Sequence, residues 1–304
     1  MLQQTRIEAV IEYYYRFMDK VPTIEALSMI PEDELLKLWE GLGYYTRARN
    51  LKKAATMIIN DYNGVFPSDY STILSLPGIG EYTAGAISSI CFNLKEVAID
   101  GNVMRVYARV NNLDIDVSDI KVKKVIGIAI KNLLPSCSGD FNQAIMELGE
   151  TICIPVGTPK CNTCPLKQKC LAHQFGRESL IPQKVLKKDK IIEEYTVLLI
   201  RYHNLYALRK RREGLLKNMW EFPNVKGLLT DEEISSIIPN SKNIQLGISN
   251  THIFTHKKWI MNSYYLETTE KRHEYDWFPL EEIETKLAIP TAFQPFLSFL
   301  IQKK

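Results

Sequence analysis

The sequence predicts a mostly α-helical domain followed by a smaller α+β domain. In the first half, apolar residues recur at helical spacing, as in Ile7-Val10-Ile11-Tyr14. Residues 176–190 then form a lysine-rich stretch with few apolar side chains, which is typical of a linker. From Glu194 onward, β-branched and aromatic residues form strand-like runs. A chain of 304 residues is long enough for two such domains.

Composition and charge exclude several classes of protein. Hydrophobic residues make up 45% of the chain and charged residues 24%, which excludes a disordered or collagen-like protein. The net charge of +3 is too small to indicate a partner, although a local basic surface can exist within it. No apolar run approaches the roughly 20 residues of a membrane span, and the first residues lack an apolar signal core. We therefore expect a cytoplasmic protein without a membrane segment.

In the first half we expect helices over 7–14 and 51–59, and another that begins near Asp140 and carries Ala144, Ile145 and Leu148 on one face. Prolines should separate the helices, because proline breaks a helix interior. Those prolines are Pro22, Pro31, Pro67 and Pro77. We assign residues 1–175 to this helical domain, 176–190 to the linker and 191–304 to the second domain.

The second domain should combine strands and helices. Strands are expected over 195–202 and 205–208, where apolar and β-branched residues dominate. Helical patterns follow over 231–238, 280–287 and 292–301. This mixture is typical of a small α+β domain.

Four of the six cysteines lie within 18 residues and are spaced C-x7-C-x2-C-x5-C: Cys153, Cys161, Cys164 and Cys170. Secreted disulfide frameworks usually spread their cysteines, so this cluster indicates a metal site. Zinc ribbons favour two C-x2-C pairs, and only one is present here. The pattern favours a single [4Fe–4S] cluster over zinc. Cys91, between Ile90 and Phe92, is expected in the core.

The segment 153–190 around these cysteines holds eight basic and two acidic residues. Two interpretations remain open. The lysines can form an ordinary solvated face, or they can contact nucleic-acid phosphates and make binding salt-dependent.

The run Leu76-Pro77-Gly78-Ile79-Gly80 lies between two helical segments. Gly78 and Gly80 permit a tight turn, and the helix that begins at Glu81 would direct backbone N–H groups outward. Such a helix end can bind an anion, for example a DNA phosphate. By itself the run also fits a plain corner between two helices. With the cysteine cluster downstream it indicates a DNA-binding hairpin.

Together these motifs resemble the helix-hairpin-helix DNA glycosylases with an iron–sulfur cluster, and within them the adenine DNA glycosylases of mismatch repair. The resemblance covers residues 1–172 through MLQQTRIEAVIEYYYRF, LWEGLGYYTRARNL, LPGIGEYTAGAISSICF, AIDGNVMRVYAR, FNQAIMELG and the cysteine cluster. It extends to a C-terminal nudix-like domain through GLLKNMWEFPNVKG and HIFTHKKWIMNSYYLE. It implies a monomer that excises adenine paired with 8-oxoguanine or guanine in double-stranded DNA, near the nucleoid if the source is bacterial.

The resemblance assigns the catalytic residues. Asp100 matches the carboxylate that stabilises the positively charged sugar, and Asn102 matches a residue that supports it. From the residues alone, an aspartate before a glycine at a helix start is more simply an N-cap. Tyr82 stands where related glycosylase-lyases have a lysine. Since a phenol cannot form a Schiff base, a monofunctional enzyme is expected.

The resemblance also assigns DNA-contacting residues. Gln4 and Thr5 match positions that probe the oxidised guanine, and Leu42 and Tyr44 match residues that wedge into the duplex. Without the resemblance, Leu42 and Tyr44 would be assigned to the core.

In the second domain, Phe254, Thr255 and His256 match a loop that checks for 8-oxoguanine. No R-E-x-x-E-E run is present, so this half is expected to recognise the lesion and not to hydrolyse a pyrophosphate.

One departure concerns the proton donor. In the family this donor is a glutamate two residues before the Met of MLQQT, and this chain begins at that Met. We therefore expect an apparently truncated enzyme that releases adenine slowly or not at all. Two alternatives remain: a non-catalytic mismatch-binding protein, and a glycosylase-lyase of the same fold. The seven residues between Cys153 and Cys161, where six are usual, should be absorbed by the loop.

Overall fold

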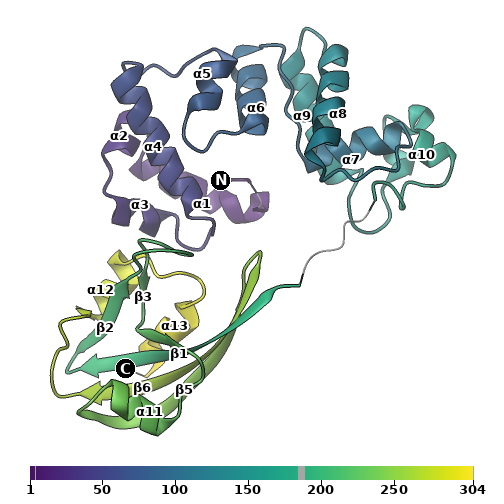
Figure 1. Cartoon of the computed structure of the whole chain (residues 1–304). Helices are drawn as coiled ribbons and strands as arrows, with labels where there is room; N and C mark the ends of the chain where they lie inside the picture. Colours follow the sequence, from purple (N-terminus) through teal and green to yellow (C-terminus); the bar gives the residue numbers. More distant parts are fainter. Residues whose placement is uncertain (4, 184–188, 304) are drawn as a thin grey trace. The chain divides into compact units, whose positions relative to one another are not determined.

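The computed structural model describes residues 1–3, 5–183 and 189–303. The chain divides into two compact units (Figure 1). One consists of residues 57–187, and the other combines residues 1–56 with 188–304.

The unit of residues 57–187 is helical. Its core is formed by Ile99, Val103, Met104, Ile126 and Ile130. The helices are α5 (Tyr70–Ser75), α6 (Glu81–Phe92), α7 (Gly101–Val110), α8 (Ile120–Leu133), α9 (Ser138–Thr151) and α10 (Leu171–Gln174), with two short 3₁₀ turns, η1 (Cys161–Thr163) and η2 (Lys167–Lys169). The predicted helix near Asp140 is thus confirmed as α9, which begins at Ser138.

The close packing of α9 against α7 depends on a glycine. A Cβ atom at Gly149 would lie 2.5 Å from Cβ of Asn102, so any side chain there would force the two helices apart. Since Asn102 lies in the first turn of α7, this contact fixes the beginning of that helix.

The other unit begins with α1 (Ile7–Lys20), α2 (Ile24–Met29) and α3 (Glu32–Leu38) and includes the first part of α4 (Thr46–Asp61). The four predicted helix-separating prolines lie outside the helices, as expected. Trp39, Leu35 and Leu36 are buried in a core that these helices share with Met219 and Ala288. The first 56 residues therefore pack directly on the C-terminal part of the chain.

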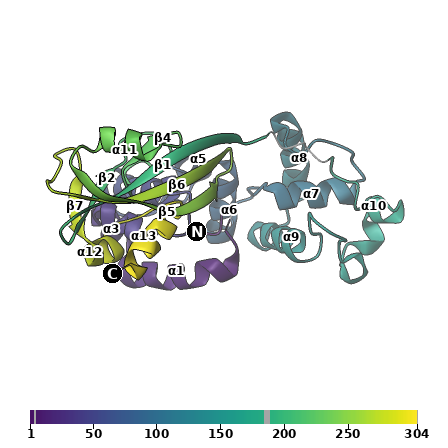
Figure 2. The same cartoon turned by 90° about the horizontal axis from the view of Figure 1, so that it is seen from below.

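That C-terminal part is a seven-stranded mixed sheet with helices (Figure 2). The strand order is β3-β2-β1-β6-β5, β4 pairs with β1, and β7 pairs with β2. The central pair β1–β6 is parallel, and the remaining pairs are antiparallel. The strands are β1 (Ile191–Tyr202), β2 (Leu205–Lys210), β3 (Trp220–Glu221), β4 (Asn224–Lys226), β5 (Ser241–Ile253), β6 (Lys257–Thr268) and β7 (Asp276–Pro279).

The three helices of this part are α11 (Asp231–Ile237), α12 (Leu280–Lys286) and α13 (Gln294–Gln302). They confirm the three helical patterns predicted from the sequence. α12 and α13 contribute Ile283, Phe296 and Leu300 to a core on one side of the sheet. Ile234 of α11 belongs to a separate core with Leu198 and Ile200 of β1.

Only part of the predicted linker can be compared with the structure, because residues 184–188 lie outside the described residues. Before them, Ile181 is buried against Ala108 and Ala172, and its carbonyl oxygen accepts a hydrogen bond from Arg109 Nε at 2.8 Å. The chain thus packs on α7 well beyond residue 175. The proposed domain boundaries stay a prediction.

Cys91 is exposed near the end of α6, so the prediction that it lies in the core is wrong. Its neighbour Ile90 is also exposed, because α6 turns Ser88 and Ser89, and not Ile90 and Cys91, toward the interior. None of the helices described is long and apolar enough to cross a membrane.

Candidate active site

The glycine hairpin presents the first turn of α6. Leu76 is buried and anchors the turn, whereas Gly78 and Gly80 are exposed. Gly78 has φ +81°, a left-handed conformation that glycine adopts without strain. Gly80 is the N-cap of α6 and has no side chain to cap the helix. An anion can therefore approach the positive end of α6 closely.

Asp100 is the N-cap of α7 and is partly buried. Its Oδ1 accepts a hydrogen bond from Val103 N–H at 2.8 Å, and its Oδ2 accepts one from Asn102 Nδ2 at 3.0 Å. The predicted cap is thus present, and it does not exclude the catalytic role, because each carboxylate oxygen has a further lone pair. A Cβ atom at the neighbouring Gly101 would contact nothing within 4 Å, so the space beside Asp100 is open.

Tyr82 lies in the first turn of α6, close enough to Asp100 for their charges to interact. Burial raises the pKa of Tyr82, and the charge of Asp100 raises it further. The phenol is therefore neutral at physiological pH. Its hydroxyl donates a hydrogen bond to Met146 Sδ at 3.3 Å, which orients the ring against α9.

A series of hydrogen bonds connects Asp100 to the cysteine loop. Asn102 Oδ1 accepts from Arg105 Nη2 at 2.9 Å, and Arg105 Nε donates to the carbonyl oxygen of Cys153 at 2.8 Å. Arg105 Nη2 also donates to the carbonyl oxygen of Gly149 at 2.7 Å. Our sequence analysis missed Arg105. The available signal was a pair of arginines, Arg105 and Arg109, one turn apart in a helix that is otherwise largely apolar.

The four predicted metal-ligating cysteines line one pocket together with Arg109, His173 and Glu178: Cys153, Cys161, Cys164 and Cys170. Arg109 is buried, and its Nη1 donates a hydrogen bond to Cys153 Sγ at 3.2 Å. Burial raises the pKa of the Cys161 and Cys170 thiols. Both thiols would therefore be protonated at neutral pH unless a metal ion displaced the proton.

The other unit contains a pocket that opens to solvent. Tyr44 and Thr255 lie on its wall, and their hydroxyl groups are 3.3 Å apart. Tyr44 is half exposed and has a left-handed backbone (φ 48°), which is uncommon for a bulky residue and typical of functional positions. The pocket is also lined by Arg49, His252, Phe254, His256, Pro290, Thr291 and Ala292.

Leu42, Thr5 and Gln4 are the remaining residues of the N-terminal helices and of the segment before them that were predicted to contact DNA. Leu42 is buried in the helical core, so it would have to leave that core to enter a duplex, whereas Tyr44 is already exposed. Thr5 Oγ1 accepts a hydrogen bond from Arg47 Nη2 at 3.4 Å. Gln4 lies outside the described residues.

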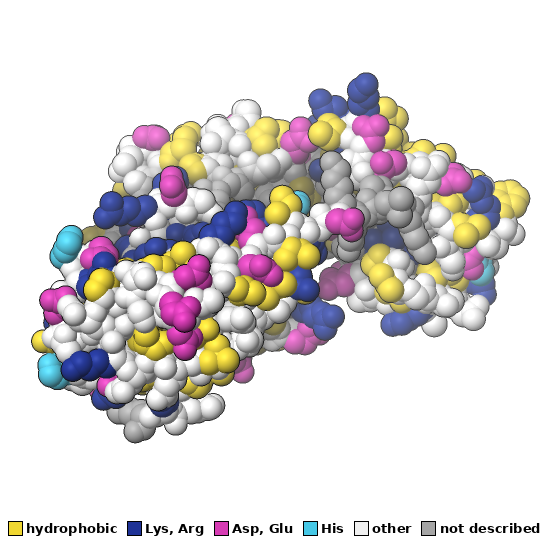
Figure 3. Space-filling view, turned by 60° about the horizontal axis from the view of Figure 1, so that its bottom comes forward, with side chains coloured by type: hydrophobic (Ala, Val, Ile, Leu, Met, Phe, Trp, Pro, Cys, Tyr) yellow, Lys and Arg dark blue, Asp and Glu magenta, His cyan; other side chains and the backbone are white. Residues whose placement is uncertain are grey.

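The predicted checking loop is the turn between β5 and β6. Phe254 stacks edge-on against Trp259 and His252, and burial lowers the pKa of His252. Thr255 and His256 are exposed at the tip of the turn. Figure 3 shows that acidic and basic side chains are intermixed on the face that it presents, so any contact with phosphates there is local.

Comparison with known proteins identifies two domains in this chain. Residues 1–129 match the model of the HhH-GPD superfamily of base excision DNA repair proteins, and residues 196–299 match a NUDIX domain. An adenine DNA glycosylase of Buchnera aphidicola subsp. Acyrthosiphon pisum is 34% identical over 310 residues, which covers 98% of this chain and 87% of the relative. The chain belongs to the adenine DNA glycosylase family.

Two further similarities bear on the fold and on the extent of the match. An adenine DNA glycosylase of Buchnera aphidicola subsp. Baizongia pistaciae is 41% identical over 226 residues, and this match spans 73% of the chain and 64% of that relative. A structure of a non-covalent endonuclease III–DNA complex aligns with TM-score 0.50 and 25% identity over 58% of this chain and 80% of that chain. The predicted fold class, a helix-hairpin-helix glycosylase domain followed by a nudix-like α+β domain, is confirmed.

Proposed function

We propose that this protein is a monofunctional DNA glycosylase that removes adenine paired with 8-oxoguanine or guanine by hydrolysis of the N-glycosidic bond. The observation that carries the proposal is the placement of Asp100, a carboxylate with both oxygens oriented by hydrogen bonds, beside the neutral Tyr82 and after the glycine hairpin. Family membership supports adenine as the base. The endonuclease III–DNA complex supports duplex DNA as the partner.

The chemistry follows from the arrangement. Adenine must leave the base stack before its glycosidic bond can be reached. As that bond breaks, the sugar acquires positive charge, and the Asp100 carboxylate stabilises it. Asn102 keeps the carboxylate oriented through its 3.0 Å hydrogen bond. The departing purine takes a proton from a general acid that we assign to no residue of this sequence. As the C–N bond breaks, water forms a C–O bond to the sugar and gives up a proton, so that the products are free adenine and an abasic site. Since Tyr82 cannot form an imine with the sugar, the strand stays intact.

We further propose that Cys153, Cys161, Cys164 and Cys170 hold one [4Fe–4S] cluster. The donor set fits, because four thiols line one pocket and a buried guanidinium contacts one of them. The sequence spacing, with a single C-x2-C pair, favours a cluster over zinc. When bound, the cluster would cross-link the loop that Arg105 joins to α7.

We propose that Tyr44, Thr255 and the rest of their pocket recognise the base opposite adenine. The pocket combines stacking surfaces with hydroxyl and imidazole groups, which suits a purine that carries extra polar atoms. Thr5 and Gln4 are proposed to contribute from the N-terminal segment. We also propose that the protein acts as a monomer.

A single-turnover assay tests the function. Protein in excess over an A:8-oxoguanine duplex should release free adenine and leave the strand uncleaved, and borohydride should trap no protein–DNA adduct. A trapped adduct would instead indicate a lyase. Binding to the mispair without any base release would favour a non-catalytic protein.

A further inference from the structure

The loop between α12 and α13, residues 287–293, forms part of the wall of the Tyr44–Thr255 pocket. Pro290, Thr291 and Ala292 of this loop line the pocket. The loop has no regular secondary structure of its own, so its position depends on tertiary contacts. Whatever holds it determines the shape of this part of the pocket.

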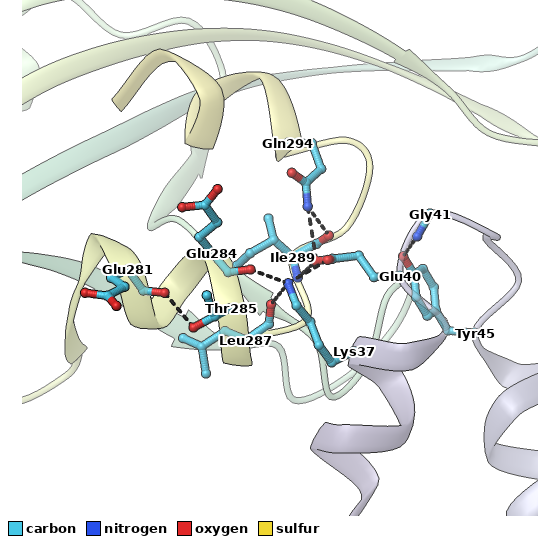
Figure 4. A network of polar contacts seen from close by, with 10 residues as sticks. All are labelled: Lys37, Glu40, Gly41, Tyr45, Glu281, Glu284, Thr285, Leu287, Ile289 and Gln294. Atoms are coloured by element: carbon cyan, nitrogen blue, oxygen red, sulfur yellow. Dashed lines mark hydrogen bonds and ion pairs between the residues drawn. The ribbon is translucent and has the colours of Figure 1, made fainter. Parts of the chain in front are cut away.

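Two charged side chains near the end of α3 hold this loop (Figure 4). Glu40 Oε1 accepts hydrogen bonds from the backbone N–H of Ile289 at 2.6 Å and from Gln294 Nε2 at 3.1 Å. Gln294 is the first residue of α13, so Glu40 holds both the loop and the helix that follows it.

Lys37 completes the arrangement. Its Nζ donates to Glu40 Oε2 at 2.6 Å and to the carbonyl oxygens of Glu284 and Leu287 at 2.8 and 3.0 Å. These carbonyls are at the C-terminal end of α12, where a cation is favourable. The Lys37 and Glu40 side chains are only 22% and 19% exposed, so solvent weakens these charge-assisted bonds less than at an open surface.

Tyr45 extends the same contact. Its hydroxyl accepts a hydrogen bond from Gly41 N–H at 3.3 Å and lies close to the side chain of Thr291. Residues 37–45 therefore have two roles. Lys37 and Glu40 hold the loop, and Tyr44 lines the pocket.

We propose that Lys37 and Glu40 are positioning residues that set the distance between the Thr291 side and the Tyr44–Thr255 side of the pocket, and thereby its preference for 8-oxoguanine over guanine opposite adenine. This inference rests on the proposed function. Neither Lys37 nor Glu40 lines the pocket. The pair acts through the backbone of the loop, because Ile289 is adjacent to the pocket residue Pro290.

A matched control comes from a second ion pair between the same two parts of the unit. Lys210 Nζ lies 2.6 Å from Asp33 Oδ1, and among the described residues neither side chain hydrogen-bonds the loop or lines the pocket. Asp33→Asn removes this ion pair and leaves the hydrogen bonds of Lys37 and Glu40 to the loop in place. If Lys37 and Glu40 affected only the stability of the protein, Asp33→Asn would change DNA binding in the same way as the Lys37 and Glu40 variants.

The test compares the full chain with Glu40→Met, which removes the acceptor of the Ile289 N–H, Lys37→Met, the double variant and Asp33→Asn. The first readout is the ratio of dissociation constants for A:G and A:8-oxoguanine duplexes. The second is the hydrogen-exchange protection of the Ile289 amide. We expect both single variants to lower the ratio about five- to tenfold, as loss of one or two well-placed hydrogen bonds would, and to lose the protection. Asp33→Asn should change neither.

The double variant is the control for misfolding of the single variants. Because it removes both charges, it leaves no half-buried charge without a partner. It should melt no lower than the single variants and show the same reduced ratio. The inference is overturned if variants that have lost the Ile289 protection keep the wild-type ratio of dissociation constants. It is also overturned if Asp33→Asn lowers this ratio as much as the Lys37 and Glu40 variants do. Equal wild-type affinity for the two duplexes would overturn it as well. Failure of the wild-type chain to release adenine would count against the proposed function alone, because the ratio needs only binding.

Discussion

The proposed catalytic residues and the proposed lesion pocket are built in different ways. Tyr82, Asp100 and Asn102 come from one short stretch of the chain, and each is held by its own helix or by the neighbouring α9. The walls of the pocket come from segments around residues 44, 255 and 291, which lie far apart in the sequence. The catalytic geometry therefore depends mainly on local helix caps. The pocket depends on the packing of the N-terminal helices on the C-terminal part of the chain.

This difference predicts that substitutions at the proposed catalytic residues or at the cysteine cluster abolish or strongly reduce function. Substitutions in the Tyr44–Thr255 pocket should instead change the affinity for the base opposite adenine. The following experiments, in order of decreasing effect, test that distinction.

Cys161→Ser should abolish metal binding, because one of four proposed ligands is lost. The loop of 153–170 should then lose its cross-link, and stability should fall by more than about 4 kcal/mol. Iron analysis, visible absorption and urea unfolding measure these effects. Cys91→Ser is the matched control, because Cys91 is exposed and lies outside the pocket. Full iron content in Cys161→Ser would contradict the ligand assignment.

Asp100→Asn should reduce single-turnover adenine release about 10²–10⁴-fold, because a neutral amide cannot stabilise the positive sugar. Affinity for the mispair should remain. Stability should also remain close to that of the wild type, since asparagine caps a helix as well as aspartate does. Release at the wild-type rate would mean that Asp100 acts only as the cap of α7.

Tyr45 tests the packing that supports the pocket. Burial is the main cause that raises its pKa to about 12. A raised pKa stabilises the folded state below the unfolded value of about 10, and this contribution is lost as the pH rises from about 10 to 12. The loss should amount to about 2–3 kcal/mol. Urea unfolding at pH 9 and 11 should therefore show a steeper decline for the wild type than for Tyr45→Phe. Parallel declines would show that Tyr45 does not titrate in this way.

Thr255→Val and Tyr44→Phe should have the smallest effect. Each removes one hydroxyl of the 3.3 Å pair without removing the side chain's bulk. We expect the affinity for the A:8-oxoguanine duplex to fall about 2- to 10-fold, with adenine release at saturating protein unchanged. Thr251→Val on β5, exposed and outside the pocket, is the control. A large drop in the release rate would show that this pocket takes part in the chemistry.

Much of the catalytic site could be predicted from the sequence because its signals are local. A glycine hairpin before a helix, an aspartate before Gly101 and four closely spaced cysteines each specify a short-range structure. The outcomes for Tyr44 and Cys91 show where local reasoning ends. Local patterns assign both residues to the core, and both are exposed, because exposure depends on what packs against a segment from elsewhere in the chain.

Periodicity and motif spacing along the chain are enough to predict the two fold classes, and the family and the residues proposed for catalysis follow from the resemblance of its motifs to known glycosylases. The packing of the first 56 residues on the C-terminal part of the chain, and the contacts of Lys37 and Glu40 with the loop at 287–293, are visible only in the folded protein. The cause is the distance along the chain. Hydrogen bonds between groups some 250 residues apart form only after both segments have folded and packed, and neither segment carries a local pattern that identifies its partner.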